Sequence, residues 1–229
     1  MDNQPQEIRL NKFLAERLGI SRREADELIA RGEVFVDKKP AVLGEKIDNS
    51  SEVCYNKKII PFLKEYTYLL FNKPVGVVCS KKRQGEVPTL YELLPEKYRS
   101  LKTVGRLDKD SSGLIILTDD GDFSYQMTHP KFYKIKVYHV KLDRPLAPLH
   151  QQIIADFGIE IGDGISKLGL EKLNEERTEF IVEMSEGRNR QIRRTFAALG
   201  YSVVRLNREK FGNYSLGELK PGKFREVKI

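Results

Sequence analysis

Apolar and polar positions in the first sixty residues follow two helical patterns and then two extended ones. The segment IRLNKFLAERLGI carries apolar residues at helical spacing, at Leu10, Phe13, Leu14 and Leu18. This spacing predicts a helix with one buried face, and Gly19 is a residue type that often ends a helix. Ser21 with Glu24 three residues later forms a capping-box pattern, so a second helix should start there. The segments EVFVDKKPAV and SEVCYNKKII each predict two short strands around a turn, the first turn at Asp37 and Lys38.

After residue 66 the apolar runs become longer, and strand patterns alternate with short helical ones. Runs typical of strands occur in YTYLLFN, VGVVCS and GLIILT. A capping-box pair, Thr89 and Glu92, predicts a helix in TLYELLP. A further short helix should follow the turn in DDGDFSYQM. The change of pattern predicts two domains, over residues 1–62 and 66–229.

The alternation of apolar and polar residues in FYKIKVYHVKL contains an irregularity. From Tyr133 to Val137 the apolar residues stand at odd-numbered positions, and from Tyr138 on they stand at even-numbered positions. A slip of one residue within a strand predicts a β-bulge at Tyr138. Because bulges often redirect side chains beside active sites, Tyr138 is a candidate site residue.

Basic residues cluster where the last helix is predicted, in EGRNRQIRRTFAALGY. An amphipathic helix over about residues 189–199 would place Arg190, Arg193 and Arg194 together on its polar face, with Arg188 just before it. The predicted helix contains no acidic residue to pair with them. We therefore expect this stripe to bind phosphate or carboxylate groups rather than only to keep the surface soluble.

Composition and charge restrict the class of protein. The 229 residues are 40% hydrophobic and 32% charged. No run approaches the ~20 apolar residues of a membrane helix and no secretory pattern is present, so we expect a soluble, cytoplasmic protein. Neither Cys54 nor Cys79 stands in a disulfide or zinc motif. Residues 188–229 hold 11 Lys and Arg against 3 Asp and Glu, which accounts for the formal charge of +7. Such a basic block predicts a polyanionic partner, because clustered cations release condensed counterions on binding.

The segment VGRLDKDSSGLIILTDDGD places Asp108 and Asp110 in a loop ahead of an aliphatic strand. Three explanations are open. Residues from Asp108 to Asp119 follow the spacing of a calcium loop, but no helix precedes them and the final position lacks the usual glutamate. Asp110, Ser111 and Ser112 have the composition of an ordinary turn. Asp108 can instead be a catalytic carboxylate at the mouth of the strand.

Motifs along nearly the whole chain resemble those of one enzyme family. IRLNKFLAERLGISRREADELIARGEVFVDKKP resembles the alpha-L RNA-binding domain, which ribosomal proteins and RNA-modifying enzymes share. LFNKPVGVVCS, VGRLDKDSSGLIILTDDGD, THPKFYKIKVYHV and EGRNRQIRR resemble, in order, the motifs of the RNA pseudouridine synthases of the RsuA family. The resemblance implies an α+β protein in which a small N-terminal alpha-L domain precedes a catalytic domain with a mixed, largely antiparallel sheet flanked by helices.

The resemblance also assigns roles to residues. It implies that Asp108 is the catalytic carboxylate, that Tyr138 is the active-site tyrosine and that Arg193 pairs with the carboxylate. Arg106 corresponds to an arginine that is thought to take the place of the flipped-out nucleotide. Lys73 corresponds to a position that is either structural or phosphate-facing. Further RNA contacts are expected from cations of the last helix and of the alpha-L domain: Arg188, Arg190, Arg194, Lys12, Arg22 and Arg23.

The implied reaction is the site-specific isomerisation of uridine to pseudouridine in ribosomal RNA. Asp108 would attack or stabilise the anomeric carbon of a flipped-out uridine as the base departs. The reaction is redox-neutral, and the resemblance implies no metal, nucleotide or flavin. We expect a monomer that modifies large-subunit RNA, with small-subunit RNA and tRNA open. In residues 157–176 we identify no segment that resembles a motif of the family, and we take them as a candidate for target choice.

An alternative function from another class is a non-catalytic RNA-binding factor in ribosome assembly, built on the same scaffold. Such a factor would bind RNA tightly without forming pseudouridine, and changes at Asp108 would not affect it.

Overall fold

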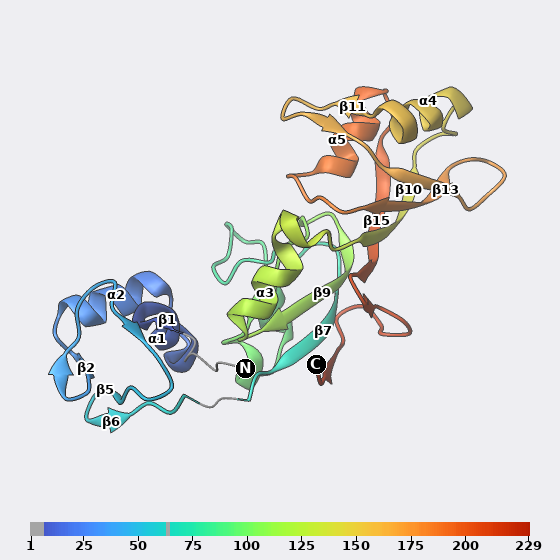
Figure 1. Ribbon diagram of the computed structural model, residues 1–229. Coiled ribbons are helices and arrows are strands. Elements are labelled where there is room, and N and C mark those ends of the chain that lie inside the picture. The colour runs from blue at the N-terminus through green and yellow to red at the C-terminus, as the bar shows by residue number, and fades with distance from the viewer. Residues whose placement is uncertain (1–6, 63–64) are drawn as a thin grey trace. The chain divides into compact units, whose positions relative to one another are not determined.

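The computed structural model describes residues 7–62 and 65–229, and the chain divides into two compact units (Figure 1). The first unit runs to Tyr66 and includes Asp119–Gly121, and the second comprises Thr67–Thr118 and Asp122–Ile229. The predicted boundary between residues 62 and 66 spans residues 63 and 64, which lie outside the described residues. No helix in the described ranges has the length and apolar content that crossing a membrane requires.

The first unit packs two helices against short strands. Helices α1 (Leu10–Leu18) and α2 (Arg22–Ala30) form as predicted, with Gly19 in the left-handed conformation after α1 and a complete capping box at Ser21 and Glu24. Both predicted hairpins are confirmed, and Asp37 and Lys38 take the positive φ angles of a tight turn. The strands are β1 (Ile8–Arg9) paired with β4 (Lys46–Ile47), and a sheet of β3 (Lys39–Pro40), β2 (Val34–Val36), β5 (Val53–Tyr55) and β6 (Lys58–Ile59).

The second unit is built on one nine-stranded sheet. Its main order is β13-β14-β10-β15-β9-β7-β17, with β8 beside β9 and β16 beside β15. Only the β9–β15 pair is parallel among the described strands, which confirms the mixed, largely antiparallel sheet. The strands are β7 (Tyr68–Lys73), β8 (Lys102–Val104), β9 (Ser112–Thr118), β10 (Lys136–Leu142), β13 (Gly169–Lys172), β14 (Glu179–Met184), β15 (Val203–Phe211), β16 (Tyr214–Ser215) and β17 (Phe224–Val227), with a separate hairpin of β11 (Ile159–Glu160) and β12 (Ile165–Ser166).

Helices α3 and α5 cover opposite faces of this sheet. Met127 of α3 packs with Leu114 and Ile116, whereas Phe196 of α5 belongs to the cluster of Ile115. Because alternate residues of a strand point to opposite faces, the fully buried strand β9 has a core on each side. The helices are α3 (Gly121–Thr128), α4 (Pro148–Gln152) and α5 (Gln191–Ala198), with 3₁₀ turns at Leu90–Leu93, Glu96–Tyr98 and Pro130–Phe132 and a π-helical turn at Ile153–Phe157.

Two predicted elements before β8 differ in the structure. VGVVCS is not a strand, because Gly76 takes a positive φ and turns the chain, leaving one isolated bridge between Val78 and Thr89. The capping box in TLYELLP forms as predicted, but it starts a 3₁₀ helix of four residues, Leu90–Leu93, rather than an α-helix.

Two boundaries were predicted too early because non-glycine residues interrupt the pattern. Strand β10 begins at Lys136, since Tyr133 takes φ 47° and ends the preceding 3₁₀ turn. Helix α5 begins at Gln191, since Arg190 takes φ 48°. Both residues occupy the left-handed region, which side chains other than those of glycine and asparagine rarely adopt.

A bulge lies at Tyr138 as predicted, but its extra residue belongs to the partner strand β15 and not to the strand of Tyr138. Between β10 and β15 the register steps from Val137 opposite Lys210 to Tyr138 opposite Arg208, so Glu209 is the extra residue. Directly paired residues of antiparallel strands project to the same side. The bulge therefore aligns the side chains of Tyr138 and Arg208.

The parallel pairing of β9 with β15 depends on Gly113. This residue pairs with Arg208 at φ 107°, and a β-carbon there would lie 2.3 Å from the main-chain oxygen of Arg208. A glycine is therefore required for the close approach of the two strands. The approach brings the loop ahead of β9, which contains Asp108, beside Arg208.

Candidate active site

A cavity of about 470 Å³ opens in the second unit, between the loop before β9, strands β10 and β15, and the segment that leads into α5. This volume is within the range of small-molecule sites. Five predicted site residues line it: Arg106, Asp108, Tyr138, Arg188 and Arg190. Its apolar lining consists of Leu107, Met184, Ile192, Leu206 and Phe211.

Asp108 lies at the mouth of the cavity, in the loop between β8 and β9. Its side chain is 32% exposed, and the nearest cation is Arg190, whose Nη1 lies 3.8 Å from Oδ2. This separation is too long for the paired hydrogen bonds of a bidentate ion pair. The carboxylate oxygens of Asp108 therefore stay available to a ligand.

Arg193 contacts Asp110 rather than Asp108, so the predicted pair is wrong. Its Nε lies 3.3 Å from Oδ2 of Asp110, and its Nη2 donates to the main-chain oxygen of Asp110 at 2.8 Å. Arg190 donates to both carboxylate oxygens of Asp110, at 3.0 and 2.9 Å, and this bonding holds the pKa of Asp110 below its ordinary value. Asp110, expected only to form a turn, is the carboxylate that ties the loop to α5.

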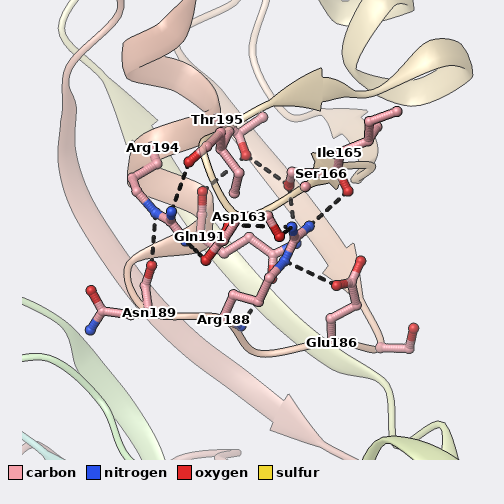
Figure 2. A network of polar contacts seen from close by, with 12 residues as sticks. Asp163, Ile165, Ser166, Glu186, Arg188, Asn189, Gln191, Arg194 and Thr195 are labelled. Carbon is pink, nitrogen blue, oxygen red and sulfur yellow. Dashed lines mark hydrogen bonds and ion pairs between the residues drawn. The ribbon is translucent and has the colours of Figure 1, made fainter.

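The arginine stripe expected to meet phosphates is occupied by acids of the chain itself (Figure 2). Arg188 donates to the main-chain oxygens of Asp163 and Ile165 at 3.1 and 2.8 Å, and pairs with Glu186 at 3.1 Å. Arg194 donates to the Asp163 carboxylate at 2.7 Å. The helix itself contains no acid, as the sequence indicates, but Asp163 and Glu186 from outside the helix pair with these arginines.

Buried hydroxyl and amide groups fasten the β11–β12 hairpin to helix α5 in the same region (Figure 2). The Ser166 hydroxyl accepts from Gln191 Nε2 at 3.0 Å and from the Thr195 hydroxyl at 2.8 Å, and all three residues are buried. Residues 184–192 line the cavity on this side. The hairpin, which lies within residues 157–176, therefore supports one wall of the cavity.

Removing the Asp163 carboxylate should loosen this wall. Asp163→Ala takes away the acid shared by Arg188 and Arg194, and we expect kcat/KM to fall on the order of 10-fold, since misplaced site residues slow catalysis. The control is Asp156→Ala, an exposed aspartate of the preceding turn, which should leave the rate unchanged. A faster enzyme with a lower KM would instead mean that Asp163 competes with RNA phosphates for the arginines.

Lys73 is a buried structural residue and cannot meet a phosphate. Its side chain is 0% exposed, and Nζ donates to the main-chain oxygens of Pro74 at 3.0 Å and Ser111 at 2.7 Å. Burial lowers its pKa. Lys73 thus holds the end of the Asp108 loop, so of the two roles left open for it the structure supports the structural one and not the phosphate contact. Arg106, by contrast, is exposed at the cavity and forms no ion pair within the described ranges.

The cations predicted for the alpha-L domain lie in the first unit. Arg22 and Arg23 are exposed at the start of α2, and Lys12 is half-buried on α1. The Glu24 amide donates to the Ser21 hydroxyl at 3.1 Å, so the capping box already uses one of the helix amides that were expected to bind an anion.

Two cations of the cavity, Lys136 and Arg208, were missed in the sequence. Arg208 is 2% exposed, its Nε donates to the main-chain oxygen of Leu114 at 2.7 Å, and its Nη2 has no hydrogen-bond partner among the described residues. Lys136 Nζ donates to the main-chain oxygens of Ser185 and Glu186, at 3.1 and 2.9 Å. Neither cation forms an ion pair in the part of the chain that is described. A buried cation without a counterion is costly, which indicates a site for an anionic group.

Local pattern could not identify either residue. A slip within the strand at Tyr138 would place Lys136 on the opposite face, whereas the regular alternation of β10 puts Lys136 and Tyr138 on the same face. Arg208 had no signal beyond its place in the basic C-terminal block, because its burial results from the pairing of β15 with β9 and β10.

Lys136 should make the enzyme sensitive to alkaline pH. Burial, together with repulsion from Arg208, lowers the pKa of Lys136 from 10.5 to about 8. The cation is present below that pH and lost above it, so we expect kcat/KM to fall above about pH 8. Lys136→Arg stays protonated and should lack this alkaline limb. An unchanged alkaline limb in Lys136→Arg would contradict the assignment.

The same shift fixes the sign of a stability effect. Between the folded and the unfolded pKa of Lys136 the unfolded chain binds a proton that the folded chain has lost. The contribution of this group to the free energy of unfolding therefore rises from about pH 8 to 10.5.

Comparisons with known proteins agree on one family. Residues 67–198 match the family model described as RNA pseudouridylate synthase, and residues 8–59 match the S4 domain. The chain is 37% identical to the ribosomal small subunit pseudouridine synthase A of Vibrio cholerae, over 95% of each chain. It is 34% identical to the ribosomal large subunit pseudouridine synthase B of Bacillus subtilis, over 96% of this chain and 91% of the relative. A crystal structure of a pseudouridylate synthase aligns with a TM-score of 0.69 and 33% identity, over 96% of both chains.

Proposed function

Because the chain belongs to the RNA pseudouridylate synthase family, we propose that it converts specific uridines of ribosomal RNA to pseudouridine. The names of the relatives support ribosomal RNA as the substrate. The observation that carries the proposal is that Asp108, Tyr138 and Arg106 line one cavity of nucleoside size. We propose Asp108 as the nucleophile, Tyr138 as the ring that faces the uracil, and Arg106 as the side chain that fills the place of the flipped base.

The chemistry needs one bond to break and another to form. The bond between N1 of uracil and C1′ of ribose breaks and leaves its electron pair on the base, while the Asp108 carboxylate bonds to C1′. The uracil turns until C5 faces C1′, the C5–C1′ bond forms, and the carboxylate leaves. The proton on C5 is then lost and N1 gains one. No electron is gained or lost overall, so the residues need only hold, orient and stabilise charge.

The cationic end of the cavity suits the departing base. When the N1–C1′ bond breaks, negative charge spreads over N1 and the two carbonyl oxygens of the uracil. Arg208, which is buried with a free Nη2, and Lys136 offer positive charge and hydrogen-bond donors at the lining of the cavity. We assign them to stabilise that charge. No hydrogen bond within the described chain engages the Tyr138 hydroxyl, which supports a role for it in moving the C5 proton.

In this proposal one domain binds RNA and the other carries out the reaction. Residues 1–62 would dock on RNA through a local patch that contains Lys12, Arg22 and Arg23, and residues 66–229 would carry the reaction. The expectation of a large-subunit target stays a prediction, because relatives of similar identity are named for the small and for the large subunit.

Mapping of pseudouridines in ribosomal RNA from cells with and without the gene tests this function. We expect one or a few positions, in one subunit, to be pseudouridine only when the gene is present. An identical map in both strains would contradict the proposal, and tRNA from the same cells serves to detect a different RNA substrate.

A further inference from the structure

An exposed aromatic surface borders the cavity. We call it the aromatic ledge, and it consists of Tyr125, His129, Lys131, Phe132 and Tyr133. The ring centroid of Tyr125 lies 4.7 Å from that of His129 and 5.8 Å from that of Phe132. Lys131 Nζ lies 5.1 Å from the Tyr125 centroid and 4.8 Å from the Phe132 centroid. Thr128 and Pro130, which stand between these residues in the chain, line the cavity. The ledge is thus continuous with the proposed active site.

The rings of the ledge are open to solvent. Tyr125 is 45%, Phe132 37% and Tyr133 76% exposed. Single exposed apolar residues are ordinary on a protein surface, but adjoining aromatic rings beside a cavity are typical of a binding surface. Stability of the fold does not account for the Tyr133 ring in particular, because it buries only a small part of its area.

The backbone at Tyr133 is strained. Its φ of 47° and ψ of 45° lie in the left-handed region, which glycine and asparagine adopt more easily than a bulky aromatic residue. No ring contact with another described aromatic residue and no buried packing offsets this strain. Strained residues of this kind are concentrated at functional sites.

The charge near the ledge identifies the class of partner. Residues 123–135 contain Lys131 and Lys134 and no acidic residue. Flat aromatic faces interleaved with cations match the bases and phosphates of single-stranded nucleic acid, where each base stacks on a ring. Exposed rings with cations beside them, next to a cavity of nucleoside size, favour a nucleic-acid strand over a protein partner.

We infer that the aromatic ledge binds an unpaired base adjacent to the flipped uridine. The inference rests on the proposed function, because it takes RNA as the ligand of the cavity. Flipping one nucleotide removes a stacking partner from its neighbour in the strand. Stacking of that neighbour on Tyr133 would restore the lost contact and favour the flipped state, while Lys131 and Lys134 face the adjoining phosphates.

Steady-state kinetics of Tyr133→Asn test the ledge on the transcript that contains the mapped uridine. Asparagine accepts the left-handed backbone, so the variant should unfold at the same or a higher temperature. We expect its KM to rise about 10-fold with kcat little changed, whereas Tyr133→Phe should match the wild type. Leu149→Asn removes an equally open apolar side chain outside the cavity, 64% exposed, and should change neither constant. An unchanged KM in Tyr133→Asn would overturn the inference.

A fluorescence measurement detects the stacking independently of turnover. The chain has no tryptophan, so Tyr133→Trp introduces a single indole at the ledge and Leu149→Trp a matched one elsewhere. Stacking of a base on an indole quenches its emission, and we expect oligouridylate to quench Tyr133→Trp but not Leu149→Trp. No quenching at Tyr133→Trp would overturn the ledge as a base-binding surface. If oligouridylate quenches Tyr133→Trp but the wild-type protein forms no pseudouridine, the proposed function is overturned, while the ledge remains a base-binding surface.

Discussion

Replacement of Asp108 with asparagine should abolish pseudouridine formation and leave the fold intact. The amide has nearly the shape of the carboxylate, but it cannot bond to C1′ or stabilise the positive charge that develops there. We expect the rate to fall by roughly 10⁴-fold or more, as for other catalytic nucleophiles. Because the side chain is 32% exposed and forms one long ion pair, thermal unfolding should change little. Since the reaction releases the C5 proton, the release of tritium from uridine labelled at C5 measures the rate directly.

Asp110→Asn is the matched control for this experiment. Asp110 lies two residues away in the same loop, but its carboxylate is bound to Arg190 and Arg193. Loss of these ion pairs should lower the unfolding temperature while leaving measurable turnover. Equal loss of turnover in both variants, without a difference in stability, would contradict the distinct role of Asp108.

Replacement of Arg208 with methionine should lower activity without lowering stability. Arg208 is buried, has no counterion in the described residues and has an unpaired Nη2 at the cavity. Removal of a donor that stabilises developing negative charge typically costs about 10² to 10³ in kcat. A buried cation without a counterion is unfavourable in the free enzyme, so an apolar chain of similar length should keep or raise the free energy of unfolding.

The opposite directions of these two effects make the role of Arg208 testable. Arg205→Met is the control, because Arg205 lies on the same strand but is exposed, and it should retain full activity. Arg208→Lys keeps the charge and should retain more activity than Arg208→Met. Parallel loss of activity and stability in Arg208→Met would show that Arg208 is a structural residue rather than a group that stabilises the departing base.

Features with a local cause could be predicted from the sequence. The capping box at Ser21 and the turn at Asp37 depend on residues within a few positions of each other, and both formed as expected. The bulge at Tyr138 was predicted at the right place, but its extra residue comes from β15. Local patterns failed where the backbone left its ordinary conformation. Arg190 and Tyr133 take left-handed φ angles that no periodicity indicates, so both following elements begin later than predicted.

The polar partners at the cavity could not be predicted, because they are distant in the sequence. Arg188 and Arg194 form ion pairs with Asp163, which lies in a hairpin more than 20 residues earlier in the chain. Arg193 forms an ion pair with Asp110 in the loop before β9. An arginine stripe without a nearby acid therefore says little about whether its charges are free. The burial of Lys73 is likewise a result of sheet assembly, and nothing in its local sequence distinguishes it from an exposed lysine.

We propose that the protein isomerises a uridine bound in this cavity, with Asp108 as the nucleophile. The most direct measurement is a single-turnover reaction of purified protein, in excess, with unmodified transcripts of both ribosomal RNAs, followed by counting of pseudouridine by mass spectrometry. We predict that the wild type forms pseudouridine at a defined position and that Asp108→Asn binds the same transcript but forms none. Tight binding of either transcript by a folded wild-type protein with every uridine unchanged would contradict the claim and favour a non-catalytic RNA-binding factor.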